Sequence, residues 1–218
     1  MIKFENTDVS GWQAAIRGMR NPKNSWDKSD SGFKPVIEPP CNDIALRYVV
    51  GTNDLNLMKQ LVQAGSDHSK FMRMINVTVD VIAPLYWWKE ADTYKVGTVR
   101  NSCSTMHKVT AKEFELDDFS HEHLISSNAN EDAMGCLYHI IDVLNHFRLM
   151  YINHDKYKDY WWQIIQLLPS SYNQRATLQL NYAVLRNIYH SRKTHKLDEW
   201  HDFCHWVEGL PYSELITL

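Results

Sequence analysis

The residue types best suited to chemistry gather between positions 95 and 108. These fourteen residues include two lysines, one arginine, one histidine and four hydroxyl side chains. Hydroxyls, cations and backbone N–H groups are the donors that bind a phosphate-bearing ligand. The stretch therefore predicts a loop that binds such a ligand. A hydroxyl-rich connecting loop has the same composition, and composition alone leaves both interpretations open.

A second candidate is a metal site near the C-terminus. His201, Cys204 and His205 recur at i, i+3 and i+4, so a helix could point all three in one direction. Zinc needs further ligands, and the glutamate of a His-Glu-x-x-His helix is missing. The run 121–123, His-Glu-His, is typical of a solvated loop. We expect no metal centre.

Several common sequence motifs of enzymes are absent. The sequence contains no Gly-x-Ser-x-Gly turn, no Gly-x-x-x-x-Gly-Lys phosphate loop and no dinucleotide fingerprint, and its eight glycines are dispersed. These absences argue against a classical Rossmann domain and against a nucleophile elbow. Two Trp-Trp pairs, at 87–88 and 161–162, are either core anchors or planes on which a ring stacks.

Bulk composition narrows the class of protein. The chain has 218 residues and a formal net charge of −3, which argues against a nucleic-acid-binding protein. No apolar run approaches the roughly 20 residues of a membrane helix, and the N-terminus lacks the apolar stretch of a signal peptide. The cysteines, Cys41, Cys103, Cys136 and Cys204, are widely scattered. We therefore expect a single cytoplasmic domain over residues 1–218.

Hydrophobic periodicity predicts the elements that must position these residues. We expect a peripheral entry segment over residues 1–45, with a short helix and then a Pro-, Ser- and Asp-rich loop through Pro39-Pro40. A helix opened by Asn53 and ended by Gly65 should precede a strand with one buried face, which Arg73 interrupts. The expected helices are 12–19, 53–64, 86–92, 131–153, 156–168, 174–191 and 198–207, and the expected strand is 71–82. This predicts an α+β fold, with an antiparallel sheet in the N-terminal half packed against a long helical C-terminal half.

The order of several segments resembles that of the flavin-dependent thymidylate synthases. In that family a Gly-His-x-Ser-Pro-Phe-Glu-His segment leads into a strand and a helix, followed by the signature Arg-His-Arg-x-x-Ser-x-x-x-x-Ser-x-Arg. Here the corresponding segments are Gly-Ser-Asp-His-Ser-Lys-Phe-Met-Arg at 65–73, Thr-Tyr-Lys at 93–95 and Ser-Thr-Met at 104–106. The order and approximate spacing match, although most identities differ.

The C-terminal part is closer to the family. The family shows Leu-Pro, then Asn-x-Arg-Ser-Leu-x-Asn-x-x-x-x-Arg, a histidine and a tryptophan. This chain has Leu-Pro at 168–169 and then Asn181, Asn187, Arg192, His195 and Trp200. Together the two resemblances cover roughly residues 53–208.

The resemblance implies an activity, cofactors and an assembly. It implies reductive methylation of dUMP, or of a related pyrimidine nucleotide, with FAD held at the subunit junctions of a homotetramer. Reduced flavin passes a hydride, methylenetetrahydrofolate donates the methylene group, and NADPH is the expected reductant.

The resemblance also assigns residues to roles. Arg192 falls on the arginine that holds the pyrimidine, and Ser104 falls on the signature serine near the nucleotide; these two are the expected catalytic residues. The expected substrate-binding residues are Arg100, Ser102, Ser104, Thr105 and Arg192. The expected cofactor-binding residues are Arg73, Tyr94, Lys95, Asn181, Asn187 and His195, with Lys196 as the alternative to His195.

The chain departs from the family at positions that hold phosphate. Met106 replaces the signature arginine, and Ile165 replaces the arginine three residues before Leu-Pro. A lysine does not replace an arginine that grips a phosphate through two parallel hydrogen bonds. The candidate replacements are Arg100, Lys108 and Arg175. Two further hypotheses therefore stay open: a non-catalytic nucleotide- or flavin-binding protein, and a structural protein that binds partners through exposed aromatic residues.

Overall fold

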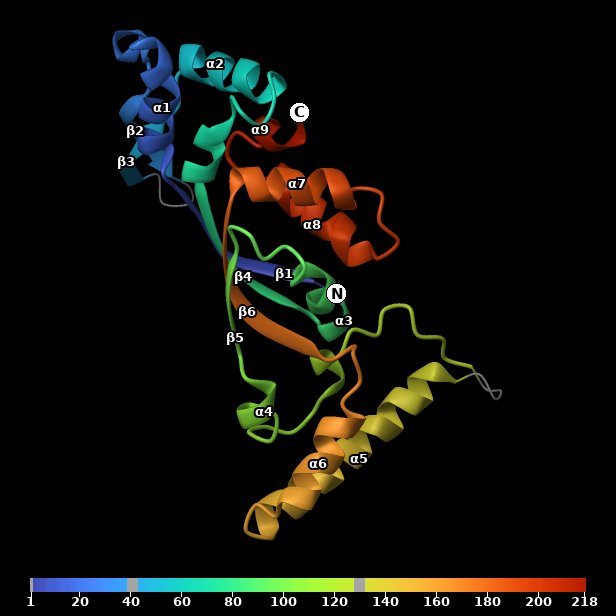
Figure 1. The fold of residues 1–218 in the computed structure, drawn as a ribbon. Coiled ribbons are helices and arrows are strands. Elements are labelled where there is room, and N and C mark those ends of the chain that lie inside the picture. Colours follow the sequence, from blue (N-terminus) through green and yellow to red (C-terminus); the bar gives the residue numbers. More distant parts are fainter. Residues whose placement is uncertain (1, 39–42, 128–131) are drawn as a thin grey trace. The chain divides into compact units, whose positions relative to one another are not determined.

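The computed structural model describes residues 2–38, 43–127 and 132–218 (Figure 1). Tertiary contacts divide the chain into two compact units. The first unit comprises Met1–Glu5, Asp80–Thr93 and Arg100–Thr177, and the second comprises Asn6–Val79, Tyr94–Val99 and Leu178–Leu218. Each unit is built from segments that are distant in the sequence. The expectation of a single domain over residues 1–218 stays a prediction.

A four-stranded antiparallel sheet contains strands from both halves of the sequence. Its strands, in spatial order, are β1 (Lys3–Ser10), β4 (Asn76–Pro84), β6 (Asn173–Asn181) and β5 (Val99–Ser102). Successive side chains of a strand point to opposite faces, and β4 follows this rule with Val77, Val79, Val81 and Ala83 buried. The predicted α+β fold with an antiparallel sheet is confirmed, although β6 comes from the C-terminal half.

The first unit has a helical core of its own. Its helices are α3 (Leu85–Ala91), α4 (Thr105–Lys108), the 3-10 helix η4 (Leu116–Asp118), α5 (Ala133–Asn153) and α6 (Lys158–Leu167). Figure 1 shows α5 and α6 lying side by side. The apolar stripe of α5 packs Leu137, Ile141 and Leu144 against Phe119 and Ile164, as the helical periodicity predicts.

The second unit contains helices that pack on one another, an aromatic core and a two-stranded hairpin. Its helical elements are α1 (Trp12–Arg20), η1 (Asn21–Lys23), η2 (Trp26–Lys28), α2 (Thr52–Gln63), η3 (Lys70–Met74), α7 (Tyr182–Arg192), α8 (Asp198–Glu208) and α9 (Glu214–Thr217). Strands β2 (Gly32–Glu38) and β3 (Asp43–Val49) form an antiparallel hairpin. The rings of Trp12 and Tyr182 meet edge to face with centroids 5.3 Å apart, and both are buried. No helix among the described residues is long and apolar enough to cross a membrane.

Most of the expected helices are confirmed to within a few residues, but several segments differ from the prediction. Residues 3–10, expected in the peripheral entry segment, form strand β1 of the sheet, and residues 99–102, expected in a loop, form β5. The segment expected as a loop after the first helix contains β2 and β3, while its Pro39-Pro40 and Cys41 lie outside the described residues, as does position 131. Residues 174–181 belong to a strand, because Ala176, Leu178 and Leu180 are buried and alternate with exposed neighbours. A period of two indicates a strand and not the predicted helix.

A further difference concerns the start of the predicted strand 71–82. Residues 71–74 form part of η3, where the consecutive side chains Phe71 and Met72 are both buried. Arg73 is therefore an exposed residue of a 3-10 helix, not an interruption of a strand's buried face. Gly65 ends α2 with a positive φ of 106°, as predicted.

A buried ion pair joins α1 to α2 in the second unit. Asp54 is fully buried and accepts a 2.6 Å hydrogen bond from Nε of Arg20, whose side chain is also buried. The hydroxyls of Ser29 and Ser31 donate to the other carboxylate oxygen at 2.6 Å. The carboxylate of Asp30, and not Asn53, caps α2 by accepting from the backbone of residues 53 and 54. One carboxylate therefore organises the segment that precedes the hairpin.

This arrangement predicts a pH-dependent loss of stability in Asp54→Asn. Burial alone would raise the pKa of Asp54, but the hydrogen bonds from Ser29, Ser31 and Arg20 outweigh it and lower the pKa. The stabilisation is therefore present above about pH 4 and is lost as the pH falls through the native pKa. At pH 7, Asp54→Asn should lower the free energy of unfolding by about 3–5 kcal/mol, the cost of breaking a buried pair. Urea unfolding from pH 3 to 8 measures this, with the exposed Asp67→Asn as control; a deficit that did not shrink at low pH would contradict the account.

Candidate functional site

The site begins at the junction between β6 and α7. Asn181 ends the strand, and its side-chain oxygen accepts a 3.1 Å hydrogen bond from the backbone N–H of Val184, which caps the helix. The next residue, Tyr182, is fully buried, and its N–H donates to the carbonyl of Ile75 at 3.1 Å. These bonds fix the first turn of α7. The position of every later residue on that helix follows from this start.

Arg192, at the last turn of α7, lies against two aromatic rings. Its Nε donates a 2.9 Å hydrogen bond to the hydroxyl of Tyr94. Its guanidinium carbon lies 4.8 Å from the centroid of the Trp200 ring and 5.5 Å from that of Tyr94. Trp200 is almost fully buried, so the guanidinium rests on a rigid plane. The structure thus brings together Arg192 and Tyr94, which the resemblance assigned to substrate and cofactor.

His195 belongs to the same group of side chains. Its ring lies 6.3 Å from that of Trp200, edge to face, and the backbone N–H of His195 donates to the carbonyl of Arg192 at 2.9 Å. The backbone N–H of Leu197 donates to Nδ1 of His195 at 3.2 Å. An accepting Nδ1 leaves the proton of the neutral ring on Nε2. The turn after α7 therefore fixes both the position and the tautomer of this imidazole. We call Tyr94, Arg192, His195 and Trp200 the arginine cluster.

The loop that carries Tyr94 also lies close to the start of α7. Gly97 has a positive φ of 77°, and a Cβ placed on it would stand 3.0 Å from a methyl of Val184 and 3.2 Å from Nδ2 of Asn181. Only glycine adopts this conformation without strain and leaves room for both neighbours. The amide of Asn181 is thereby held between its own helix and this loop.

Thr98, in the same loop, has a buried hydroxyl. Its Oγ1 has no hydrogen-bond partner among the described residues. Nε of Arg100, in the first unit, is another buried group of this kind. Sequence reasoning did not select this residue, although the spacing of the family signature from positions 93–95 places its first serine here. The same strict count places the second serine on Cys103 and the final arginine on Thr105, one residue before the positions first assigned.

The remaining predicted residues of the second unit are more exposed. Lys95 follows Tyr94 and points to solvent, as does Lys196 after His195. Asn187 is exposed on α7, about 140° around the helix axis from Arg192. Arg73 is exposed on η3, which packs against α1 and α7, and no hydrogen bond or ion pair joins it to the arginine cluster in the described part of the chain.

Arg100, predicted to bind the substrate, belongs to the first unit, where its guanidinium already has partners within the protein. Its guanidinium lies 3.9 Å from the centroid of the Trp88 ring. Its Nη1 donates to both oxygens of Asp92, at 2.7 and 2.6 Å, and its Nη2 donates to the side chain of Gln174. The charge of Arg100 is therefore paired with a carboxylate that sequence spacing did not reveal. Arg175, another candidate replacement, is likewise paired, with Glu5 at 3.0 Å and Asp80 at 2.9 Å.

The predicted hydroxyls lie in the same unit at the end of β5. Ser102 is its last residue, and Thr105 begins α4. Ser104 caps α4, and its hydroxyl lies 2.8 Å from Nδ1 of His107. Ser104 is exposed, so its hydroxyl is accessible to a ligand while it is paired with the imidazole. Met106 is half-exposed beside it, and Ile165 packs against the core of the unit.

The potential metal ligands on α8 point in different directions. His201 and His205 are exposed, whereas Cys204 is buried. Burial raises the pKa of the Cys204 thiol to about 11, so at neutral pH it carries its proton and is a poor ligand. Within the described residues, no three His, Cys, Asp or Glu side chains are placed to hold a metal ion. Cys103, Cys136 and Cys204 are free thiols.

Comparison with known proteins identifies similar solved structures but no similar sequence. No protein-family model matches the chain, and no curated protein sequence matches it. Two crystal structures of the flavin-dependent thymidylate synthase ThyX from Helicobacter pylori, both with FAD and dUMP, match with a TM-score of 0.66 at 16% identity. They cover 98% and 99% of this chain and 94% and 97% of their own.

A third similar structure is a UMP/dUMP methylase, PolB from Streptomyces cacaoi, bound with 5-Br dUMP. It matches with a TM-score of 0.61 at 13% identity, over all of this chain and 94% of its own. The chain shares this fold. The resemblance found in the sequence is therefore confirmed at the level of the fold, and the roles of individual residues stay predictions.

The close contact at Gly97 predicts a measurable cost for a single methyl group. Gly97→Ala should lower the free energy of unfolding by about 1–3 kcal/mol, because alanine is strained at positive φ and its Cβ displaces Val184 or Asn181. Gly65→Ala is the matched control, since Gly65 also has a positive φ but no atom within 4 Å of the added Cβ. Chemical denaturation compares the two. Equal losses would mean that the contact with α7 contributes nothing.

Proposed function

We propose that this protein is an FAD-dependent methylase of a pyrimidine nucleotide, acting on dUMP or a close relative. The observation that carries the proposal is the fold, shared over nearly the whole chain with enzymes solved with FAD and dUMP. The arginine cluster supports it, because it contains Arg192, Tyr94 and His195, which the resemblance assigns to the pyrimidine and the flavin. Substrate, cofactor and reaction are our proposals for this chain.

The donors of the second unit suit planar heteroaromatic rings. Arg192 presents a cation above Trp200, and Asn181 and Asn187 carry amides, which both donate and accept hydrogen bonds. The orphaned hydroxyl of Thr98 adds a further polar group in the same unit. Guanidinium, amide and hydroxyl groups match the carbonyl and N–H edges of a pyrimidine or an isoalloxazine. These residues therefore fit the rings of both molecules.

The phosphate groups of the ligands would need a different set of donors. We propose two separate groups of such donors: Lys95 and Lys196 in the second unit, and Ser102, Ser104 and Thr105 in the first. Arg100 can contribute only if it leaves Asp92, so we do not assign it to the phosphate. Because lysine binds phosphate as a point charge, phosphate affinity should be weaker than where two arginines are present. Arg73 stays a proposed cofactor residue at the exposed face of η3.

The reaction follows from what each group can supply. FAD, when bound and reduced, supplies a hydride, and methylenetetrahydrofolate supplies the carbon; NADPH is the proposed reductant. Arg192 would hold the pyrimidine and stabilise negative charge that develops on its ring. Tyr94 and Trp200 would fix the guanidinium before the ligand arrives, so that little reorganisation is needed. His195, held as the Nε2–H tautomer, would donate to the flavin or its ribityl chain.

A second candidate function is binding without catalysis. The observation in its favour is that the arginine positions at 106 and 165 are lost and that Arg100 and Arg175 are paired within the protein. A protein that kept its contacts to the ligand's rings, but lost its contacts to the ligand's phosphates, would bind a flavin or nucleotide without turnover. Assaying dTMP formation separately from flavin binding distinguishes the two functions. We further propose a homotetramer in the cytoplasm, since the family resemblance places FAD at subunit junctions.

The role of Arg192 is tested by its removal. Arg192→Ala should weaken dUMP binding or turnover by about 1.5–3 kcal/mol, the worth of a hydrogen bond to a charged group. Its stability should change by less than about 1 kcal/mol, since Arg192 is only partly buried.

Isothermal titration calorimetry measures the affinity for dUMP, with and without FAD. Lys193→Ala is the matched control, because it removes an exposed cation from the neighbouring position. If Arg192→Ala bound dUMP as tightly as Lys193→Ala and the unaltered protein do, the alignment of α7 with the family would be wrong.

A further inference from the structure

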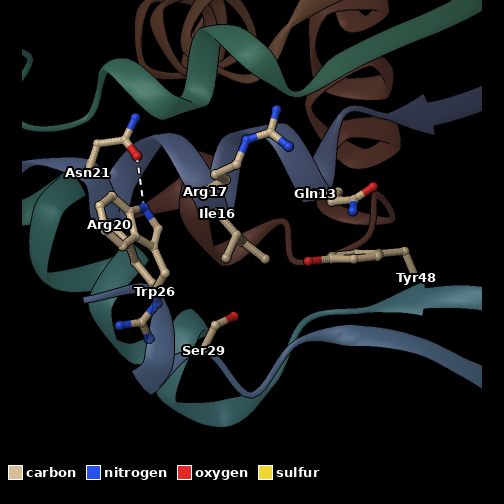
Figure 2. Close-up of a pocket in the computed structure, with 8 residues that line it drawn as sticks. All are labelled: Gln13, Ile16, Arg17, Arg20, Asn21, Trp26, Ser29 and Tyr48. Atoms are coloured by element: carbon tan, nitrogen blue, oxygen red, sulfur yellow. Dashed lines mark hydrogen bonds between the residues drawn. The ribbon is translucent and has the colours of Figure 1, made fainter. Parts of the chain in front are cut away.

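An open pocket lies in the second unit, away from the residues of the arginine cluster in the sequence. It has a volume of about 430 Å³ and is lined by residues of α1, η1, η2 and β3 (Figure 2). Small-molecule sites commonly fall between about 300 and 1,000 Å³. Its lining residues are Gln13, Ile16, Arg17, Arg20, Asn21, Trp26, Ser29 and Tyr48. None of them has a place in the proposed methylation.

One side of the cavity suits an aromatic ring. Ile16 is almost fully buried and forms an apolar floor, whereas Trp26 is half-exposed. The indole Nε1 of Trp26 donates a 2.9 Å hydrogen bond to the side-chain oxygen of Asn21, which fixes the plane of the indole. In Figure 2, Ile16 from α1 and the hydroxyl of Tyr48 from β3 project into the same space. A half-exposed, oriented indole is a surface on which a planar ligand can stack.

The charge of the lining favours an anion. Two arginines and no carboxylate line the cavity. The charge of Arg20 is neutralised by Asp54, and its remaining donors go to the carbonyls of Ser25 and Lys28. Arg17, by contrast, is exposed and has no hydrogen bond or ion pair with any described residue. Its charge is therefore available to a ligand.

The phenol of Tyr48 adds a donor. Burial, and then the nearby Asp54 carboxylate, raise the pKa of Tyr48, so the hydroxyl keeps its proton at neutral pH. No described residue forms a hydrogen bond with this hydroxyl. A protonated phenol and a guanidinium each donate to a phosphate or carboxylate. In Figure 2 the guanidinium of Arg17 points away from the hydroxyl of Tyr48, so this exposed side chain has to turn toward Tyr48 for both to bind one anion.

We propose that this cavity binds a ligand the size of a mononucleotide, with an aromatic ring stacked on Trp26 above Ile16 and an anionic group held by Arg17 and Tyr48. This site is additional to the proposed methylation site, and it does not depend on that function. The volume matches a nucleoside monophosphate better than a dinucleotide, and the four residues supply one stacking plane and one anion-binding pair.

The test uses the full chain carrying Arg192→Ala, so that binding at the proposed pyrimidine site does not interfere. Titration calorimetry with 5′-AMP and with adenosine is repeated in Arg17→Gln and Trp26→Leu. Lys34→Gln is the control, because it removes an exposed cation of the hairpin that does not line the cavity. Thermal unfolding of each variant verifies that the fold is kept.

The expected result distinguishes the affinity contributed by the ligand's aromatic ring from that contributed by its anionic group. 5′-AMP should bind at least about tenfold more tightly than adenosine, and Arg17→Gln should remove that difference without weakening adenosine. Trp26→Leu should weaken both ligands by about fivefold or more, and Lys34→Gln should weaken neither. Absence of binding at millimolar 5′-AMP, or binding that Arg17→Gln and Trp26→Leu leave unchanged, overturns the proposal.

Discussion

The arrangement of the candidate site depends on the turn in which β6 becomes α7. Asn181 ends the strand and caps the helix, and the buried Tyr182 is held through its backbone by Ile75. Eleven residues after Asn181, three turns along α7, the chain reaches Arg192. A shift of this junction by one residue would rotate Arg192 by about 100° around the helix axis and take its guanidinium off Tyr94 and Trp200. The loop with Gly97 and Thr98 lies against the same turn, so the junction sets both sides of the site.

The arginines of the two units have different surroundings. In the second unit, Arg192 rests on aromatic rings, and Thr98 of the neighbouring loop has a buried hydroxyl without a partner in the described part of the chain. In the first unit, Arg100 is already bound by Asp92 and Gln174 and lies over Trp88. The contacts of these two arginines with aromatic rings therefore serve different purposes. They orient an arginine of the proposed site in one place and stabilise a strand end in the other.

The sequence predicted the fold class, the helices with strong periodicity and most of strand β4, but not the other strands. Leu137, Ile141 and Leu144 define the stripe of α5 unmistakably, whereas Ala176, Leu178 and Leu180 were assigned to a helix because the strand runs directly into α7. The hairpin of β2 and β3 was missed because its apolar residues are interrupted by Pro35 and Lys34 and lie partly exposed. For the site, the family pattern selected Arg192, Tyr94 and His195, which the structure brings together. It could not reveal Asp92 as the partner of Arg100, because that pairing depends on the folded path of the chain and on no sequence motif.

The central claim is that the second unit holds a flavin whose position serves a pyrimidine nucleotide. The most direct measurement is the visible absorbance of the protein after incubation with FAD and removal of unbound FAD by gel filtration, recorded before and after addition of dUMP. The account predicts flavin bands that elute with the protein, shift on addition of dUMP, and fail to shift in Arg192→Ala. A protein that elutes colourless, or whose flavin bands are unchanged by every pyrimidine nucleotide tested, would contradict it.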